Sequence, residues 1–128
     1  MDIGSILRRY ADAWSRGDSV GAAACYHDAF TLHYYGRNAL SGVHAGKAVA
    51  LATLADFSRR SGYRLVAISE ILTGDHRGAI LARVAYRAPD GMAERDRMLV
   101  YAVADNLLRE CWAYNEDDAL IDELVGPS

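Results

Sequence analysis

The 128-residue chain has only two prolines, two cysteines and no excess of positive charge. Its 14 lysines and arginines are outnumbered by 17 aspartates and glutamates, so the net charge of −3 gives no support for a nucleic-acid partner. Cys25 and Cys111 belong to no CxxC pair. They could form a lone disulfide, but we favour two small hydrophobic core positions in a reducing compartment. With 52% hydrophobic and 24% charged residues, the composition excludes a disordered chain, a collagen-like repeat and a disulfide-stapled miniprotein.

Targeting and membrane signals are lacking as well. Acidic and basic residues fall within the first nine positions, and no apolar h-region of a signal peptide follows them. No apolar run approaches the roughly 18 residues that a membrane span needs. We therefore expect a cytoplasmic protein with no membrane partner. Because domains take about 100–200 residues, we expect one domain over residues 1–128.

Short metal-binding and phosphate-binding motifs are missing. The four histidines, at positions 27, 33, 44 and 76, form no HExxH or other short ligand spacing. The sequence Gly46-Lys47-Ala48 lacks the upstream glycine and the following serine or threonine of a phosphate-binding loop. No GxGxxG follows a predicted strand, and GxSxG does not occur. The sequence thus predicts no metal and no cofactor.

Helical periodicity in the first half gives way to strand patterns in the second. Helices are predicted over residues 3–14, 19–26 and 47–61, with Gly17 and Gly62 as stops, and over a short segment capped by Asp117 or Asp118. Strands are predicted over residues 30–35, 63–73, 79–87, 92–104 and 107–115, with a glycine-punctuated loop at 36–46. Helices followed by antiparallel strands indicate an α+β fold.

The turn Pro89-Asp90-Gly91 predicts the register of one hairpin. Proline followed by aspartate and a left-handed glycine suits a three-residue loop, which pairs Ala88 with Met92. That register places Arg83 opposite Arg97, where like charges repel by up to about 1 kcal/mol unless something offsets them. The offset is either solvent or an anion, such as a pocket carboxylate or a ligand, and alternation alone does not decide between them.

Eight of the twelve aromatic residues are tyrosines. Tyrosine is favoured on half-buried sheet surfaces, and a buried tyrosine needs a partner for its hydroxyl. One interpretation is packing and sheet surface, which suffices for Tyr26, Tyr34, Tyr63, Tyr86 and Tyr114. The other is a pocket lined with hydroxyls, for which Tyr10, Tyr35 and Tyr101 are the candidates.

The most distinctive stretch is residues 28–47, with the sequence DAFTLHYYGRNALSGVHAGK. It resembles the strand, glycine-rich loop and helix start of SnoaL-like proteins. They belong to the nuclear-transport-factor-2-like superfamily, together with ketosteroid isomerase, limonene epoxide hydrolase and scytalone dehydratase. The resemblance extends to residues 7–18, 105–112 and 117–124, so it covers nearly the whole chain.

The resemblance implies a cystatin-like α+β roll, in which a cone-shaped, curved antiparallel sheet wraps around N-terminal helices and encloses a pocket. It implies a homodimer formed through the outer face of the sheet, where we expect Ile80, Val84, Met98 and Val100 to contribute to the interface. It further implies that a small hydrophobic molecule contacts Trp14, Thr31, Tyr35, Leu81, Arg83, Arg97, Leu99, Tyr101 and Ala113.

The resemblance also suggests catalytic residues. Tyr10 matches the tyrosine with which ketosteroid isomerase hydrogen-bonds a developing enolate, and His33 falls where that enzyme keeps its proton-shuttling aspartate. The second acid of the oxyanion hole has no counterpart, since Leu99 lies in that region. The limonene epoxide hydrolase mechanism needs a carboxylate near the position of Ala113, and an alanine there cannot polarise water.

Histidine changes charge near neutral pH and tyrosine or arginine can stabilise an oxyanion. We therefore predict a cofactor-independent acid–base enzyme on a small hydrophobic carbonyl compound, an isomerase, an aldol-type polyketide cyclase or a dehydratase. The alternatives are a non-catalytic small-molecule-binding module and a dimeric protein-interaction domain. For His33, the alternative is a histidine held by a neighbouring hydroxyl without a catalytic role.

Overall fold

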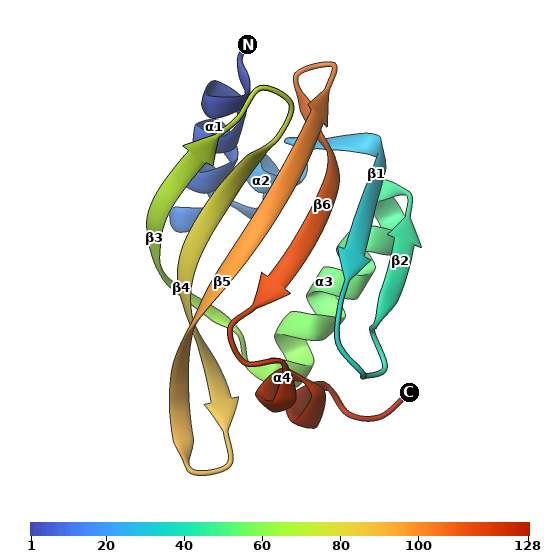
Figure 1. The fold of residues 1–128 in the computed structure, drawn as a ribbon, viewed down its shortest axis with the longest axis vertical. Helices are drawn as coiled ribbons and strands as arrows, with labels where there is room; N and C mark the ends of the chain where they lie inside the picture. Colours follow the sequence, from blue (N-terminus) through green and yellow to red (C-terminus); the bar gives the residue numbers. More distant parts are fainter.

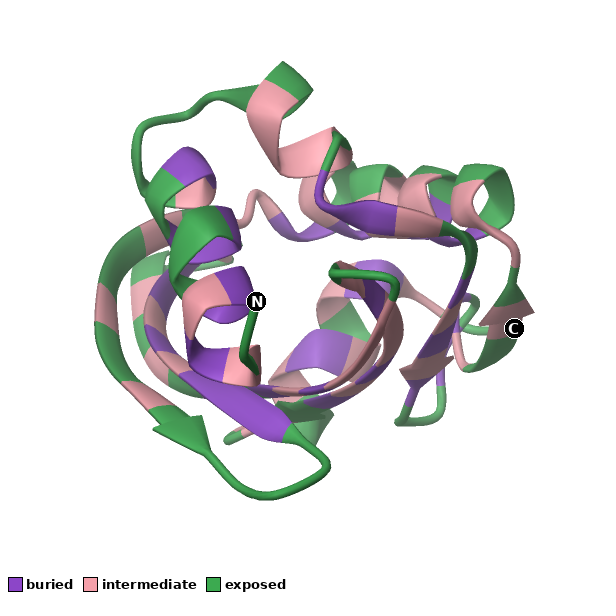
Figure 2. Ribbon diagram, turned by 90° about the horizontal axis from the view of Figure 1, so that it is seen from above, coloured by how far each residue is buried: buried purple, intermediate pink, exposed green.

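One six-stranded sheet forms a curved wall, and helices close its concave side (Figures 1 and 2). The computed structural model describes residues 1–128. In chain order the elements are α1 (Ile3–Ser15), α2 (Ser19–Ala23), β1 (Tyr26–Tyr34), β2 (Gly42–Ala45), α3 (Lys47–Ser61), β3 (Arg64–Thr73), β4 (Gly78–Ala88), β5 (Gly91–Ala104), β6 (Leu107–Asn115) and α4 (Asp118–Val125). The strand order is β2-β1-β6-β5-β4-β3. The α+β class and the curved, unclosed sheet predicted from the sequence are thereby confirmed.

Three details differ from the predicted elements. The glycine-punctuated loop contains β2, which pairs antiparallel with β1 from Thr31↔Ala45 to Tyr34↔Gly42. Strand β1 begins at Tyr26, so α2 ends earlier than predicted, at Ala23. Strands β1 and β6 run parallel, whereas every other neighbouring pair is antiparallel. Such pairing depends on segments about eighty residues apart, and local sequence patterns do not report it.

Aspartate side chains cap three of the helices, and of these Asp117 is a predicted cap. The side chains of Asp2, Asp18 and Asp117 each accept a backbone N–H in the first turn of a helix, which satisfies donors that the helix itself leaves unpaired. Helix α3 ends at Gly62, whose φ of 64° is the left-handed conformation that glycine adopts without strain. None of the helices combines the length and the apolar character needed to cross a bilayer.

The curvature of the sheet is visible in the side-chain spacing of β3. Its register against β4 shifts twice, and Leu65, Ile68 and Ile71 pack against the core at intervals of three residues. A bulge inserts an extra residue and bends the strand, so a strict alternation of two is broken here. The bent strand wraps around α1, which packs on β3 and β4 (Figure 2).

The hairpin between β4 and β5 corrects the predicted register. Ala88 pairs with Gly91, so the loop has two residues, Pro89 and Asp90, and not three. This shift by one residue places Arg97 opposite Ala82 and Arg83 opposite Asp96. The predicted facing of Arg83 and Arg97 is therefore wrong.

The shift also reverses which residues of β4 face inward, because strand side chains alternate between faces. Ile80, Ala82 and Val84 belong to the buried core, whereas the sequence placed them on the outer face with Met98. Met98 is exposed, as expected for the outer face.

The contact between α1 and β4 depends on a glycine. A Cβ added to Gly78 would lie 2.5 Å from Leu7 Cδ1 and 2.7 Å from Ile3 Cγ2. We expect Gly78→Ala to lower the free energy of unfolding by about 1–3 kcal/mol, because Leu7 is buried and has nowhere to move. The matched control is Gly4→Ala in α1, where an added Cβ would meet the mobile end of Arg8 at 3.2 Å and the methyl of the exposed Thr73 at 3.3 Å, so stability should be kept or raised. Urea unfolding followed by circular dichroism checks this, and equal stabilities of the two variants would contradict it.

Candidate ligand-binding cavity

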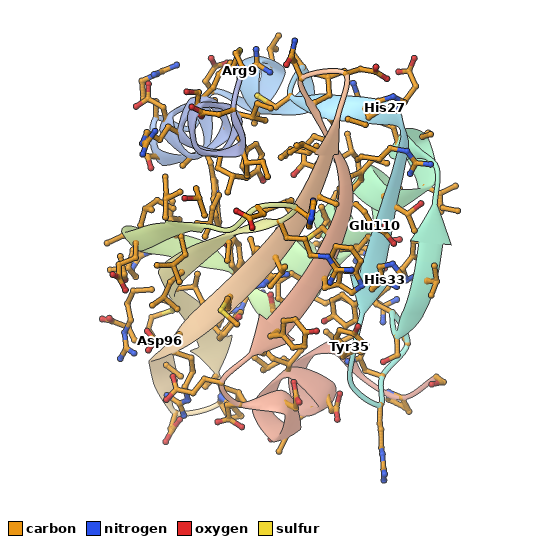
Figure 3. All side chains as sticks on the ribbon, turned by 45° about the horizontal axis from the view of Figure 1, so that its top comes forward. Arg9, His27, His33, Tyr35, Asp96 and Glu110 are labelled. Carbon is orange, nitrogen blue, oxygen red and sulfur yellow. The ribbon has the colours of Figure 1, made fainter.

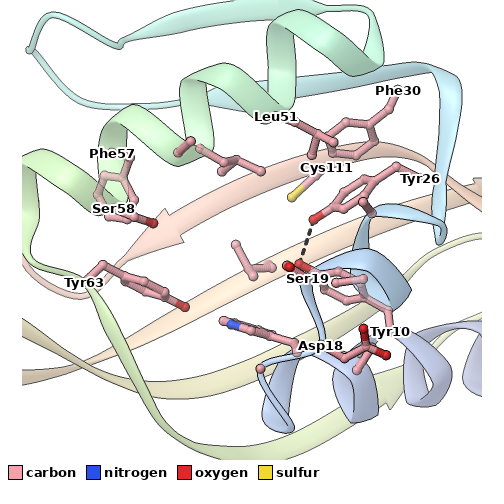
Figure 4. A pocket seen from close by; sticks show the side chains of 18 of the residues that line it. Tyr10, Asp18, Ser19, Tyr26, Phe30, Leu51, Phe57, Ser58, Tyr63 and Cys111 are labelled. Atoms are coloured by element: carbon pink, nitrogen blue, oxygen red, sulfur yellow. Dashed lines mark hydrogen bonds between the residues drawn. The ribbon is translucent and has the colours of Figure 1, made fainter.

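A cavity of about 390 Å³ lies on the concave side of the sheet, between the sheet and the first three helices (Figure 4). Fifteen of the twenty residues that line it are hydrophobic. Tyr10 and Trp14 come from α1, and Arg97, Leu99 and Tyr101 come from β5. Its size and mostly apolar lining are those of small-molecule sites in proteins.

Aromatic rings form a continuous stretch of the cavity lining. The rings of Trp14 and Tyr63 are stacked, with centroids 6.3 Å apart and an interplanar angle of 13°. Phe57 lies 5.6 Å from Tyr63, and Tyr10 lies 5.9 Å from Trp14. Such surfaces offer flat, apolar contact to a ring or to an unsaturated chain.

Three tyrosines, Tyr10 of α1 with Tyr26 and Tyr101, gather on the cavity wall. The Tyr26 hydroxyl donates to the Tyr10 hydroxyl at 2.6 Å, and the Tyr101 ring lies 5.9 Å from the Tyr10 ring (Figure 4). Burial raises the pKa values of Tyr10, Tyr26 and Tyr101 above the ordinary value of a phenol. The hydroxyls are therefore neutral at pH 7. The Tyr26 proton is used in the hydrogen bond to Tyr10, so the Tyr10 O–H is left to donate to a ligand.

Arg97 brings a positive charge to the cavity. Arg97 is only 3% exposed. Its guanidinium carbon lies 4.5 Å from the centroid of the Phe57 ring and 5.3 Å from that of the Tyr63 ring. The Nε and Nη2 atoms are buried without a hydrogen-bond partner. Cation–π contact offsets part of the cost of burying the charge, and no carboxylate of the protein forms an ion pair with it.

Other polar groups of the cavity are less reactive. Burial raises the pKa of Cys111 to about 12, against the opposing effect of the Arg97 charge, so this side chain is a neutral thiol. Asp18 is the single carboxylate among the lining residues. One of its oxygens accepts the Gly21 N–H at 2.9 Å, and the other lies 3.7 Å from Arg16. Nowhere in the chain do three histidine, cysteine, aspartate or glutamate side chains converge as a metal site requires.

Five of the predicted site residues line this cavity, namely Tyr10, Trp14, Arg97, Leu99 and Tyr101. Ala113 is buried in the core without lining it. The roles proposed for these residues remain predictions.

Five other predicted site residues lie on the outer face of the sheet, namely Thr31, His33, Tyr35, Leu81 and Arg83. Their predicted position inside the pocket is wrong. In β1, the residues that turn inward are the apolar Phe30, Leu32 and Tyr34, and the intervening residues must face outward. This alternation was present in the sequence and could have placed them correctly. Leu81 and Arg83 were misplaced by the one-residue error in the β4–β5 register.

The surroundings of His33 and Arg83 explain why they are stable on the outer face. His33 Nε2 is bonded to Glu110, and its ring stacks on Trp112 with centroids 5.1 Å apart (Figure 3). Arg83 forms an outer-face cluster with three carboxylates: its Nη1 lies 3.2 Å from Asp96 Oδ1, and Glu94 and Glu116 lie 3.4 Å and 3.9 Å from its guanidinium group. Both side chains therefore have partners outside the cavity, and His33 cannot act on a ligand within it.

Several lining residues were missed in the sequence. Tyr26 and Tyr63 were assigned to packing, and Phe57 and Asp18 were not considered for the site, yet all four line the cavity. For α3, the helical spacing of Leu51, Leu54 and Ser58 was an available signal, because these positions share one helix face. No local signal distinguishes a core tyrosine from one that lines a cavity.

Comparison with known proteins agrees with this architecture. Residues 7–111 match the SnoaL-like domain family. A Xanthomonas campestris protein of unknown function with a cystatin-like fold superposes with a TM-score of 0.87 at 19% identity, covering 98% of this chain and 99% of its own. A candidate SnoaL-like polyketide cyclase from Mesorhizobium loti gives a TM-score of 0.73 at 17% identity, with 89% and 99% covered.

A third similar structure is that of TerC co-crystallised with polyporic acid. It gives a TM-score of 0.75 at 18% identity and covers 91% of this chain and 95% of its own. No curated protein matches the sequence significantly. At these identities, the structural matches establish the fold.

The buried charge of Arg97 should lower the stability of the ligand-free protein. We expect Arg97→Met to raise the free energy of unfolding by roughly 1–2 kcal/mol, because the cost of an unpaired buried charge exceeds the cation–π contacts that are lost. Chemical denaturation of both proteins at equal concentration measures this difference.

The matched control is Arg83→Met on the outer face. It removes a solvent-exposed ion pair and should cost at most about 1 kcal/mol. A clear loss of stability in Arg97→Met would contradict the assignment of an uncompensated charge.

Proposed function

Because the chain belongs to the SnoaL-like domain family, we propose that its cavity binds a small hydrophobic carbonyl compound and that it acts on this compound as an isomerase or cyclase. The observation that carries the proposal is the buried Tyr26–Tyr10 hydroxyl pair in a cavity with an aromatic lining. A neutral phenol that already accepts one hydrogen bond is a stronger donor to a second oxygen, since linked hydrogen bonds polarise one another.

The chemistry begins with the loss of a proton from the carbon beside the carbonyl group. The electron pair of the broken C–H bond forms a C=C double bond, and the π pair of the carbonyl group moves to its oxygen, which becomes an enolate oxygen. Tyr10 donates its O–H to that oxygen, and the positive charge of Arg97 stabilises the developing anion. Return of the proton to another carbon gives an isomer. Attack of the enolate carbon on a second carbonyl gives a ring, and the alkoxide formed from that carbonyl takes up the proton.

The proton acceptor in this proposal is Asp18. The tyrosines and Cys111 are neutral because burial raises their pKa values, so none of them removes a proton at pH 7. His33, the acceptor expected from the sequence, lies outside the cavity beside Glu110. Asp18 lines the cavity and carries a carboxylate whose second oxygen, unlike the first, receives no backbone hydrogen bond.

Two similar structures support the choice of ligand class. One is the candidate polyketide cyclase, and the other, TerC, was co-crystallised with polyporic acid. The second candidate function is binding without catalysis, which is favoured by the position of Asp18 at the end of a helix, where its other oxygen already serves as a cap. A test of proton transfer separates the two.

We also propose that the chain forms a homodimer through the outer face of its sheet. Tyr35 and Tyr114 stack there with centroids 5.2 Å apart and are 43% and 44% exposed (Figure 3). Trp112 and Met98 lie on the same face. An exposed group of large apolar side chains is typical of an association surface, and a second copy would bury all of it.

Enolate formation is tested by hydrogen–deuterium exchange. We expect the protein to accelerate exchange at the α-carbon of 2-tetralone, an apolar bicyclic ketone, in D2O at neutral pH, as followed by proton NMR. Tyr10→Phe should slow the exchange about 100-fold, because one oxyanion donor is lost. Asp18→Asn should abolish it while folding is kept, since asparagine caps a helix as well as aspartate does.

The control for this experiment is Tyr114→Phe, which removes a tyrosine hydroxyl from the outer face and should leave exchange unchanged. If 2-tetralone binds and no variant changes its exchange from that in buffer, the proposed catalysis is wrong and binding alone is supported.

Self-association is tested by light scattering coupled to size-exclusion chromatography. The wild type should have twice the mass of one chain, and the double variant Tyr35→Arg, Tyr114→Arg should have the mass of a monomer, because like charges would face each other across the interface. The control Val20→Arg changes another exposed apolar residue, on α2, and should stay dimeric. A monomeric wild type would refute the homodimer.

A further inference from the structure

The part of the cavity around Arg97 holds hydrogen-bond donors without acceptors. Arg97 cannot lose its proton at physiological pH, its residue is 3% exposed, and its Nε and Nη2 atoms have no partner. Burying a charge without a counter-charge is costly, and proteins rarely retain such an arrangement without a use for it.

Two buried tyrosine hydroxyl groups near Arg97 can also donate hydrogen bonds. The hydroxyl groups of Tyr63 and Tyr34 are buried and have no hydrogen-bond partner. Burial raises the pKa values of both phenols, and the Arg97 charge opposes this rise, as expected for groups that lie near it. Both hydroxyls are therefore protonated and able to donate. Of the two, Tyr63 lines the cavity, where its ring also contacts the guanidinium face.

No carboxylate of the chain is available to Arg97. Asp18, the single acidic residue that lines the cavity, caps α2 with one oxygen, and its other oxygen lies 3.7 Å from Arg16, so it forms no ion pair with Arg97. The acidic residues adjacent to Arg97 in sequence and pairing, Asp96 and Glu116, belong to the outer-face cluster around Arg83. A planar cation beside a neutral hydroxyl donor is complementary to a carboxylate, whose two oxygens accept both.

We infer that the ligand of this cavity carries an ionised carboxylate, which binds Arg97 with Tyr63 as a second donor. The inference rests on the proposed function and narrows its substrate class to apolar acids. The apolar body of the acid then lies along Trp14 and Phe57, and its reacting carbonyl group points toward Tyr10. Arg97 then orients the molecule and compensates its carboxylate, and Tyr10 is the direct donor to the enolate oxygen.

A matched pair of probes tests the carboxylate. 3-Phenylpropanoate and 3-phenylpropanamide have the same ring, the same chain and nearly the same size, and differ in the charge of the end group. Trp14 lines the cavity and Trp112 lies outside it, so the variant Trp112→Phe leaves one tryptophan to report binding by fluorescence. All titrations are made in this background.

We expect the carboxylate to bind about 30-fold more tightly than the amide, as a charge-assisted hydrogen bond implies. Arg97→Met should abolish this preference and leave amide binding unchanged or stronger. The control Arg83→Met, which removes an equal charge from the outer face, should preserve the preference. Tyr63→Phe, which keeps the ring and removes the hydroxyl, should reduce carboxylate affinity several-fold without affecting the amide.

The outcomes separate this inference from the proposed function. Equal binding of the two probes, with no effect of Arg97→Met, overturns the carboxylate site and leaves the apolar cavity intact. Binding of neither probe overturns both. Equal loss of carboxylate affinity in Arg83→Met and Arg97→Met also overturns the inference, because net charge alone would then account for it. If Arg97→Met does not fold, Arg97→Gln and Tyr63→Phe provide the same comparison.

Discussion

The pairing of β4 with β5 determines which arginine lies inside the curved sheet. Successive side chains of a strand face opposite sides, so the pair Ala82↔Arg97 places Arg97 on the concave face and the neighbouring pair places Arg83 outside with Asp96. Because β5 also pairs with β6, the same register aligns Leu99 and Tyr101 with Ala113 and Cys111. A shift of one residue would turn Arg97 toward solvent, and it would turn Leu99 and Tyr101 away from the cavity as well.

With this register in place, every polar side chain of the cavity except Asp18 can donate a hydrogen bond. Arg97 is positive, and the tyrosine hydroxyls are neutral because burial raises their pKa values. The Cys111 thiol is neutral for the same reason. Such a site stabilises negative charge, whether it is carried by the ligand or develops on a carbonyl oxygen. Its single carboxylate, Asp18, lies at the start of α2, where one oxygen accepts the Gly21 N–H.

The outer face of the sheet has a different composition, although it is built from the same strands. There, polar side chains are paired, as in His33 with Glu110 and Arg83 with Asp96, and aromatic rings stack on one another. The guanidinium carbon of Arg77 lies 4.1 Å from the centroid of the Trp112 ring. The same tryptophan ring stacks on His33. A histidine that suggested proton transfer in the sequence is, in the folded protein, hydrogen-bonded to Glu110 on the outer face.

The sequence by itself determined the elements whose signals are local. Helix α3 spans Lys47–Ser61 with Gly62 as its cap, and β6 spans Leu107–Asn115, as predicted, because capping residues and hydrophobic periodicity lie within the elements they define. The tertiary structure decided the parallel pairing of β1 with β6, the two-residue loop of the hairpin and the face on which each arginine lies. These features depend on contacts between distant segments, and a slip of one residue changes no local pattern while it moves every side chain to the opposite face.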